Sequence, residues 1–295
     1  MQLPNYKDAK LRNKDNVVRE EYLFNDNLSN LGKGKTYHVK TYGCQMNEHD
    51  SENIKAMLEE LLHKYKFVNF VFGTNNLHRL PILLSENLNN HKQEIEVYSK
   101  EGNLIEGMPV KRASNYKAYV NIIYGCDKFC TYCIVPYTRG KQRSRSKDDI
   151  LKEVNGLVSD GYQEVTLLGQ NVNAYGKDFD YDYHMEDLLE DVAKTNIPRV
   201  RFMTSHPWDF TDKMIEVIAK YPNIMPSVHL PVQSGSSRIL KLMGRRYTKE
   251  SYLELFHKIK DIVPNVSIST DIIVGFPGET EEDFMETLSL ANECK

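Results

Sequence analysis

The segment AYVNIIYGCDKFCTYC, residues 118–133, joins a run of β-branched and aromatic residues to three closely spaced cysteines. Val, Ile and Tyr favour extended backbone, and this run is too apolar for a strand with one exposed face. The cysteines Cys126, Cys130 and Cys133 begin where the strand ends. The segment therefore predicts a buried strand whose carboxyl end leads into a thiol-rich loop.

Four further strand-like runs follow, with a helical segment between each pair. The motifs at Ser146–Asp149 and Thr280–Asp283 resemble capping boxes, which predict helix starts. Strands and helices that alternate in this way predict a parallel sheet covered by helices, with functional groups at the carboxyl ends of its strands. The four runs are EVTLLGQ (164–170), RVRFMTS (199–205), PSVHLPV (226–232) and VSISTDIIVGF (266–276).

Composition excludes a membrane protein and favours the cytoplasm. The chain has 295 residues, of which 40% are hydrophobic and 27% charged, and no apolar run approaches the roughly 20 residues that span a bilayer. The first 24 residues carry charges throughout and lack the apolar core of a secretory signal. The net charge of −3 argues against a uniformly basic nucleic-acid-binding surface, although a local basic patch is compatible with it.

The chain divides into three regions by composition. Residues 1–36 form a polar, charge-rich leader, and residues 37–110 read as a small α/β domain that contains Cys44. Residues 111–295 hold the regular alternation of strands and helices. A boundary is predicted near residue 110, after a polar stretch with two glycines and a proline.

The three clustered cysteines allow several readings. A structural zinc site usually has four protein ligands, often in two pairs, and no partner pair lies nearby. A disulfide is disfavoured because the cytoplasm keeps thiols reduced. An iron-sulfur cluster is favoured, since thiolates are its usual ligands, and three of them leave one iron with an open position for a substrate. A zinc-binding RNA module remains the alternative.

The CxxxCxxC spacing resembles the radical SAM superfamily. Two longer stretches, TYGCQMNEHDSE (41–52) and CTYCIVPYTRGKQRSR (130–145), resemble the methylthiotransferases, and specifically those that modify carbon 2 of isopentenylated adenosine next to the anticodon of tRNA. The resemblance implies an α/β fold, a partial TIM-type (βα) barrel of the radical SAM type, preceded by a shortened α/β N-terminal methylthiotransferase domain. It also implies that the barrel's last strand and a C-terminal RNA-binding barrel are absent.

The same resemblance implies roles for individual residues. Cys126, Cys130 and Cys133 would bind a 4Fe-4S cluster whose open position takes S-adenosylmethionine (SAM), and Tyr132 would pack beside the SAM adenine. Small and polar residues at strand ends can equally serve as ordinary turn residues. His206 and His229 are interpreted as structural, hydrogen-bonded histidines. The remaining residues expected to bind SAM are Gly169, Gln170, Asn171, Gln233, Ser234, Asp271 and Gly275.

A basic run follows the cysteines, with a cation at every second position. Side chains at alternate positions of an extended chain lie on one face, so the run predicts a row of cations that contacts RNA phosphates. The alternative is a solvated loop that leads into a helix. The residues are Arg139, Lys141, Arg143, Arg145 and Lys147.

The N-terminal region departs from the family pattern. The methylthiotransferases hold a second 4Fe-4S cluster on three N-terminal cysteines, whereas this chain has Cys44 alone there, and Cys294 near the end is no convincing substitute. Two functions are therefore predicted. One is a complete tRNA methylthiotransferase, a monomer served by a one-electron donor such as flavodoxin or ferredoxin. The other is a catalytically incomplete family member that binds cluster, SAM or tRNA without full turnover.

Overall fold

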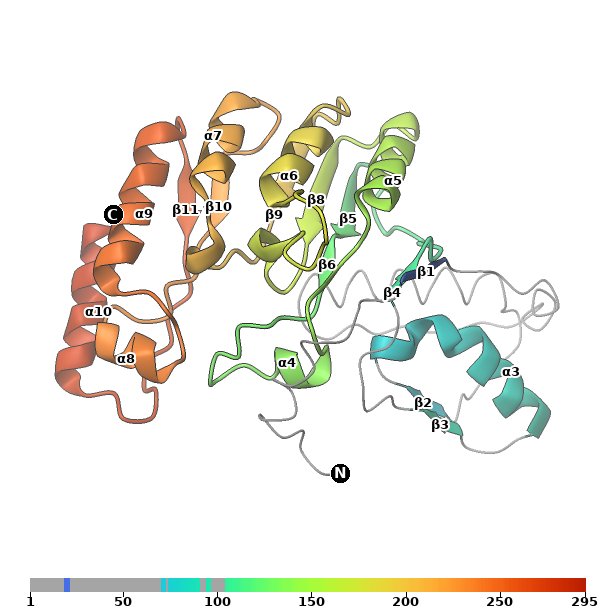
Figure 1. Ribbon diagram of the computed structural model, residues 1–295, viewed down its shortest axis with the longest axis horizontal. Helices are drawn as coiled ribbons and strands as arrows, with labels where there is room; N and C mark the ends of the chain where they lie inside the picture. Colours follow the sequence, from blue (N-terminus) through green and yellow to red (C-terminus); the bar gives the residue numbers. More distant parts are fainter. Residues whose placement is uncertain (1–18, 22–69, 73, 91–93, 97–103) are drawn as a thin grey trace.

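The computed structural model describes residues 19–21, 70–72, 74–90, 94–96 and 104–295 (Figure 1). Cys44 lies outside these ranges, as does the predicted leader except for residues 19–21. Among the described N-terminal residues, two helical segments follow the strand at residues 70–72. These elements are β1 (Arg19–Glu21), β2 (Phe70–Phe72), η3 (Thr74–Arg79), α3 (Leu80–Asn90), β3 (Glu94–Glu96) and β4 (Leu104–Glu106), with β1 parallel to β4 and β2 parallel to β3.

The main body is built on parallel strands, which confirms the predicted α/β class. Two groups of strands are linked where Ile224, just before the second group, bridges Val200 in parallel. Within the first group Ala118 lies opposite Val165, and Leu167 lies opposite Phe202. The first group is β5 (Lys117–Asn121), β8 (Glu164–Leu168) and β9 (Arg199–Phe202), and the second is β10 (Ser227–His229) and β11 (Ser267–Ser269).

Helices follow the strands in turn, so that strands and helices trace an arc from α5 to α10 (Figure 1). The two predicted helix starts are confirmed: Ser146 Oγ accepts a hydrogen bond from the Asp149 N–H, and Thr280 and Asp283 form a reciprocal capping box. The helices are α5 (Lys147–Ser159), α6 (Met185–Ala193), α7 (Asp212–Lys220), α8 (Ser237–Leu242), α9 (Lys249–Ile262) and α10 (Glu281–Glu293).

The core lies between the strands and their covering helices. Val120, Val165, Val200 and Val228 on the strands have no exposed surface. Helix residues spaced three or four apart, such as Ile150 and Val154 on α5, complete this core. Full burial of such a side chain contributes about 1.5–3 kcal/mol, so the core fixes the strand ends where the site lies.

A small hairpin interrupts the first β-α unit. Strand β6 (Ile123–Tyr124) pairs antiparallel with β7 (Arg143–Ser144), and the segment between them, residues 125–142, is called the cysteine loop below. This loop contains the three clustered cysteines and the short helix α4 (Val135–Thr138). None of the helices in the described ranges is long and apolar enough to cross a membrane.

Candidate active site

The base of the cysteine loop is held tightly at Gly125. Its N–H donates to Oε1 of Gln170 at 2.6 Å, and the next N–H, of Cys126, donates to the carbonyl of Gly140 at 3.2 Å. Gly125 has φ of 74°, and a Cβ there would lie 2.1 Å from the carbonyl oxygen of Lys141. Glycine is therefore required at this position, both for the left-handed backbone and for the close approach of the two loop ends.

The far side of the cysteine loop rests on the turn after α8. The backbone N–H of Thr131 donates to the carbonyl of Met243 at 3.0 Å, and its hydroxyl donates to the carbonyl of Leu242 at 3.1 Å. Arg245, in the same turn, directs Nη1 to Sγ of Cys130 at 3.8 Å. A segment more than a hundred residues away in sequence thus supports the middle of the loop.

Arg245 is a buried cation beside the cysteines. Arg245 is 7% exposed, and its Nη2 donates to the carbonyl of Pro231 at 2.8 Å. Its guanidinium lies 5.3 Å from the ring centroid of Tyr247. The Tyr247 hydroxyl donates to the carbonyl of Val232 at 2.8 Å, which fixes the ring. The arrangement places a permanent positive charge next to Cys130.

The three thiols suit an iron-sulfur cluster. Burial raises the pKa of the Cys126 thiol to about 12 and also raises the pKa of Cys133, so both thiols are neutral until a metal draws off their protons. In the described ranges no three Cys, His, Asp or Glu side chains converge as ligands of a single ion would. Each thiolate of a four-iron cluster binds a different iron, so the three cysteines need only surround it.

Buried polar atoms without a partner mark the same edge of the sheet. Within the described ranges these include Oδ1 of Asn171 after β8, Oγ of Ser205 after β9 and Nε of Arg245. Buried polar groups are normally hydrogen-bonded, and an exception calls for an explanation such as a ligand. A polar ligand such as SAM, with amino, carboxylate and hydroxyl groups, fits this requirement.

A second charged network anchors the cysteine loop to the short helix that follows β9. Lys128, between the first two clustered cysteines, bonds the fully buried carboxylate of Asp209 at 2.8 Å and 2.7 Å. Lys177 and Asn171 also donate to this carboxylate. Burial opposes ionisation of Asp209, but these hydrogen bonds outweigh it and hold its pKa below the ordinary value. Asp209 therefore ties the loop to the ends of β8 and β9.

The first group of expected SAM-binding residues lies around the cysteine loop. Tyr132 is 38% exposed and interacts electrostatically with Arg245, and burial of its hydroxyl raises its pKa. Gly169 packs against Ile123, where a Cβ would lie 2.2 Å from Cγ2. Gln170 bonds the loop base, and Asn171 bonds Asp209. Contact of these residues with SAM stays a prediction.

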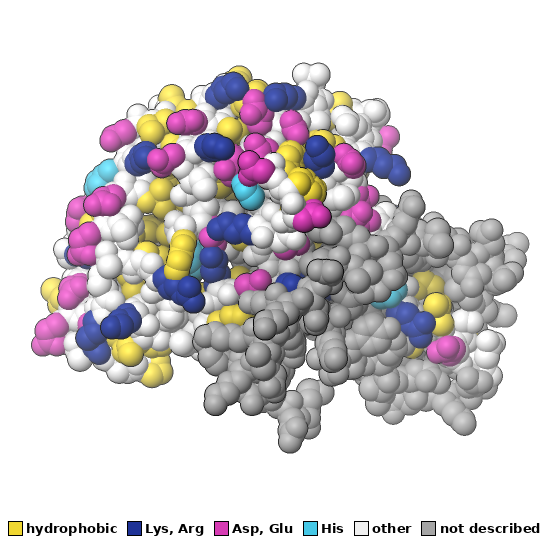
Figure 2. Space-filling model, viewed as in Figure 1, with side chains coloured by type: hydrophobic (Ala, Val, Ile, Leu, Met, Phe, Trp, Pro, Cys, Tyr) yellow, Lys and Arg dark blue, Asp and Glu magenta, His cyan; other side chains and the backbone are white. Residues whose placement is uncertain are grey.

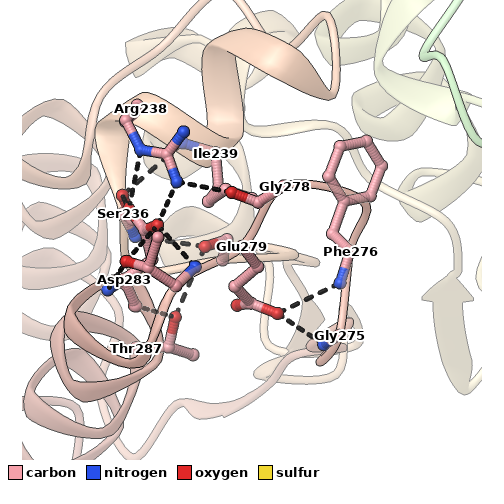
Figure 3. Close-up of polar contacts among 11 residues, drawn as sticks. Ser236, Arg238, Ile239, Gly275, Phe276, Gly278, Glu279, Asp283 and Thr287 are labelled. Atoms are coloured by element: carbon pink, nitrogen blue, oxygen red, sulfur yellow. Dashed lines mark hydrogen bonds and ion pairs between the residues drawn. The ribbon is translucent and has the colours of Figure 1, made fainter.

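The second group lies at the ends of β10 and β11. Gln233, with φ of 74°, bridges Ile272 across these strands. Asp271 pairs with Nε2 of His229 at 3.3 Å. The N–H of Gly275 donates to the carboxylate of Glu279, as Figure 3 shows.

Ser234 has a structural role in the same region. It is fully buried, and its hydroxyl accepts from the N–H of Ser236 and lies 3.3 Å from the hydroxyl of Thr287. Nearby, Asp283 of α10 accepts from Ser236 Oγ and pairs with Arg238 of α8 (Figure 3). The surroundings of Ser234 therefore join α8 to α10.

Two members of the predicted row of cations are buried, which the sequence did not predict. Arg143 is 7% exposed, and its guanidinium donates to the carbonyl oxygens of Lys141 and Arg139. Arg145 is 6% exposed and pairs with Asp149 and with Glu153, in the latter case at 2.8 Å. These carboxylates on α5 draw Arg145 inward.

Arg139 and Lys141 are half-buried at the carboxyl end of the cysteine loop. The prediction that they contact RNA is not tested by their positions.

Both histidines are hydrogen-bonded within the fold, as predicted. Nδ1 of His206 accepts from the N–H of Trp208 at 3.3 Å, and burial, assisted by Arg245, lowers the pKa of His206 to about 3. Nδ1 of His229 lies 3.1 Å from Oγ of Ser269. Sequence reasoning missed Asp209 and Arg245, although both follow predicted elements in short polar segments, SHPWD and GRRY.

A comparison with protein families and curated proteins agrees with this geometry. The profile described as the radical SAM superfamily matches residues 120–291. The tRNA-2-methylthio-N(6)-dimethylallyladenosine synthase of Staphylococcus haemolyticus is 47% identical over 360 positions, covering 100% of this chain and 70% of the relative. The enzyme of the same name from Bacillus subtilis is 46% identical and is covered to 70%. The first alignment is longer than the 295-residue chain, so the relative carries internal segments without a counterpart here.

Solved structures show the same fold at low sequence identity. The radical SAM methyltransferase TsrM from Kitasatospora setae, with tryptophan and a SAM analogue bound, is 16% identical with a TM-score of 0.52, covering 64% of this chain and 37% of its own. The cobalamin-dependent enzyme OxsB, with SAM bound, is 12% identical with a TM-score of 0.53, covering 73% and 34%. At these identities the likeness shows the fold alone.

Proposed function

The chain belongs to the radical SAM superfamily and, within it, to the tRNA-2-methylthio-N(6)-dimethylallyladenosine synthase family, and from this membership we propose that it methylthiolates carbon 2 of isopentenylated adenosine next to the anticodon of tRNA. The single observation that carries the proposal is the set of three half-buried thiols in the cysteine loop, which follows β5 and β6. A 4Fe-4S cluster with SAM at its open position would supply the electron that cleaves SAM and the radical that attacks the adenosine.

The chain's own residues orient this centre. Gln170 holds the N–H before Cys126, and Asp209 holds Lys128 between the first two ligands. The guanidinium of Arg245 offsets negative charge near Cys130. Together these contacts hold the cysteines before metal arrives, which is the form of preorganisation that a reactive site needs.

An anaerobic reconstitution tests the proposal directly. The protein is loaded with iron and sulfide, reduced with dithionite, and given SAM with and without tRNA, and 5′-deoxyadenosine and methylthiolated tRNA are measured separately. We expect 5′-deoxyadenosine from the wild type and none from Cys130→Ala, with Cys294→Ala as the matched cysteine control. If wild-type protein that has bound iron forms no 5′-deoxyadenosine, the proposed radical function is wrong.

The cysteine count favours a second candidate function. The family resemblance implies a second cluster on three N-terminal cysteines, and residues 1–110 contain Cys44 alone. In this reading the chain binds cluster, SAM or tRNA without completing sulfur transfer. It predicts 5′-deoxyadenosine without methylthiolated tRNA and about four irons per chain, whereas about eight irons and modified tRNA would rule it out.

The finer details of the proposal concern cellular context. We propose a cytoplasmic monomer that receives its electron from a small donor such as flavodoxin or ferredoxin. The reducing compartment keeps the three cysteines as thiols before cluster insertion, which supports this location. Size-exclusion chromatography with light scattering tests the monomer, and 5′-deoxyadenosine formation with a reduced flavodoxin in place of dithionite tests the donor.

A further inference from the structure

An exposed aromatic side chain lies beside the cysteine loop. Trp208, the single tryptophan of the chain, is 43% exposed in the short helix η5 (Pro207–Asp209), which follows β9. Its backbone is fixed because its N–H donates to Nδ1 of the buried His206. The indole beside the cysteine loop therefore presents part of its surface to solvent, where a ligand can contact it.

Two cations from different parts of the fold lie against this ring. Nζ of Lys128 is 5.1 Å from the ring centroid, and Cζ of Arg246 is 5.0 Å from it. Lys128 is committed to the carboxylate of Asp209, whereas Arg246 is exposed and forms no ion pair within the described ranges. Arg246 is therefore available to an incoming anion.

The same residues border a small hollow next to the cysteines. The cavity has a volume of about 90 Å³ and is lined by Asp127, Lys128, His206, Trp208, Gly244 and Arg246. Figure 2 shows Lys, Arg and hydrophobic side chains around a hollow in the coloured part of the surface. The cavity is too small for a whole nucleotide, but it gives the edge of a base or a phosphate oxygen a place beside the ring.

We propose that Trp208 and Arg246 form a contact site for single-stranded RNA, in which an unstacked base packs on the indole and its phosphate pairs with Arg246. Single-stranded RNA is recognised by stacking of bases on aromatic rings and by cations that contact the backbone. A base must also leave its stack before an enzyme reacts with it, which exposes neighbouring bases to such a platform. The proposal rests on the proposed tRNA substrate and locates the contact that the buried Arg143 and Arg145 do not provide.

The lone tryptophan makes the contact directly measurable. Reconstituted wild-type protein is titrated with tRNA that carries N6-dimethylallyladenosine while tryptophan fluorescence is recorded, and affinity is measured in parallel by filter binding. We expect saturable quenching, about ten-fold weaker binding for Trp208→Ala, and near wild-type affinity for Trp208→Phe. Arg246→Gln should bind tRNA more weakly, and its affinity should depend less on salt. Lys260→Gln, at an exposed position of α9, is the charge-matched control and should change neither the affinity nor its salt dependence.

The outcomes separate this inference from the function on which it rests. Iron content and unfolding midpoint are measured for each variant to show that it is folded. If Trp208→Ala does not fold, the weaker binding and shallower salt dependence expected of Arg246→Gln decide the question. If wild-type protein binds and modifies tRNA but Trp208→Ala binds equally tightly, the inference is wrong and the function stands. If wild-type protein forms 5′-deoxyadenosine but binds no tRNA, both the RNA contact and the tRNA substrate are wrong.

Discussion

Substitution of Gly125 with alanine tests the geometry on which the cysteine loop depends. The left-handed backbone costs a non-glycine residue about 1–2 kcal/mol. The added Cβ would also lie 2.1 Å and 2.6 Å from the carbonyl oxygens of Lys141 and Gly140, which are backbone atoms and cannot rotate away. Relief of this clash breaks the hydrogen bonds at Gly125 and Cys126, at about 1 kcal/mol each. We therefore expect a loss of about 3–4 kcal/mol in the free energy of unfolding.

Two other glycines separate the contributions. Gly161 has φ of 81° with nothing within 4 Å of its Cβ position, so Gly161→Ala should cost only the backbone term of about 1–2 kcal/mol. Gly156, inside α5, has open space around its Cβ position and ordinary helical backbone, so alanine there should stabilise by about 0.5–1 kcal/mol. Urea unfolding of the metal-free proteins under anaerobic conditions measures all three.

Cluster loading provides the second readout. Displacement of Cys126 in Gly125→Ala should lower the iron bound per chain and the absorbance near 400 nm after reconstitution, whereas Gly161→Ala should load normally. The reasoning is refuted if Gly125→Ala unfolds at the same urea concentration as Gly161→Ala and binds the same amount of iron.

Three further substitutions probe charged groups. Arg245→Met removes a buried positive charge beside the cysteines, so the cluster's midpoint potential should fall in a redox titration followed by EPR, and Arg245→Lys should shift it less; an unchanged potential would contradict this. Hydrogen bonds from Tyr221 and two lysines lower the pKa of Glu190 from 4.5 to about 2. The Glu190 carboxylate therefore stabilises the folded protein fully above pH 4.5, and this contribution is lost as the pH falls towards 2. Glu190→Gln should therefore lose less unfolding free energy than the wild type between pH 4.5 and pH 2 in acid titrations. An equal loss in the two proteins would contradict this role of Glu190. Asp209→Asn leaves Lys128 without its counter-charge and should cost about 2–4 kcal/mol in urea unfolding, reduced from the fully buried case because the lysine reaches solvent; a cost below 1 kcal/mol would show that the network is dispensable.

The strands and helices were predictable because their signals are local. Apolar runs of strand length mark β5, β8 and β9, and the Thr280–Asp283 box marks the start of α10 within four residues. The spacing of the three cysteines also lies within eight residues. Signals of this kind depend on backbone geometry over one turn or one strand, so they can be recognised without knowledge of the tertiary structure.

Burial of Arg143 and Arg145 was not predicted, because the alternation was interpreted as an extended chain with all its cations on one face. The stretch forms a hairpin strand at Arg143 and then enters α5 at Lys147, where Asp149 and Glu153 lie four and eight residues after Arg145. Acidic residues at this spacing stand on one helical face, so they can pair with a cation that precedes the helix. Their positions in the sequence were a usable signal for burial of Arg145.

The supports of the cysteine loop were not predictable from local pattern. Asp209 lies 81 residues from Lys128, and Arg245 lies 115 residues from Cys130. A buried ion pair or a guanidinium–sulfur contact over such a separation is decided by which strand ends meet in the folded sheet. Each residue alone reads as one more charge in a polar turn.

The contact between Arg245 and Cys130 also bears on how the protein is made. During synthesis the three cysteines leave the ribosome well before the segment that supports them, because 115 residues separate the two, and chains grow at about 5–20 residues per second. For several seconds or more the nascent chain therefore presents three thiols on a loop that lacks this contact, where they can bind another metal. Correct assembly favours iron-sulfur delivery to the completed fold, after translation of the fourth β-α unit.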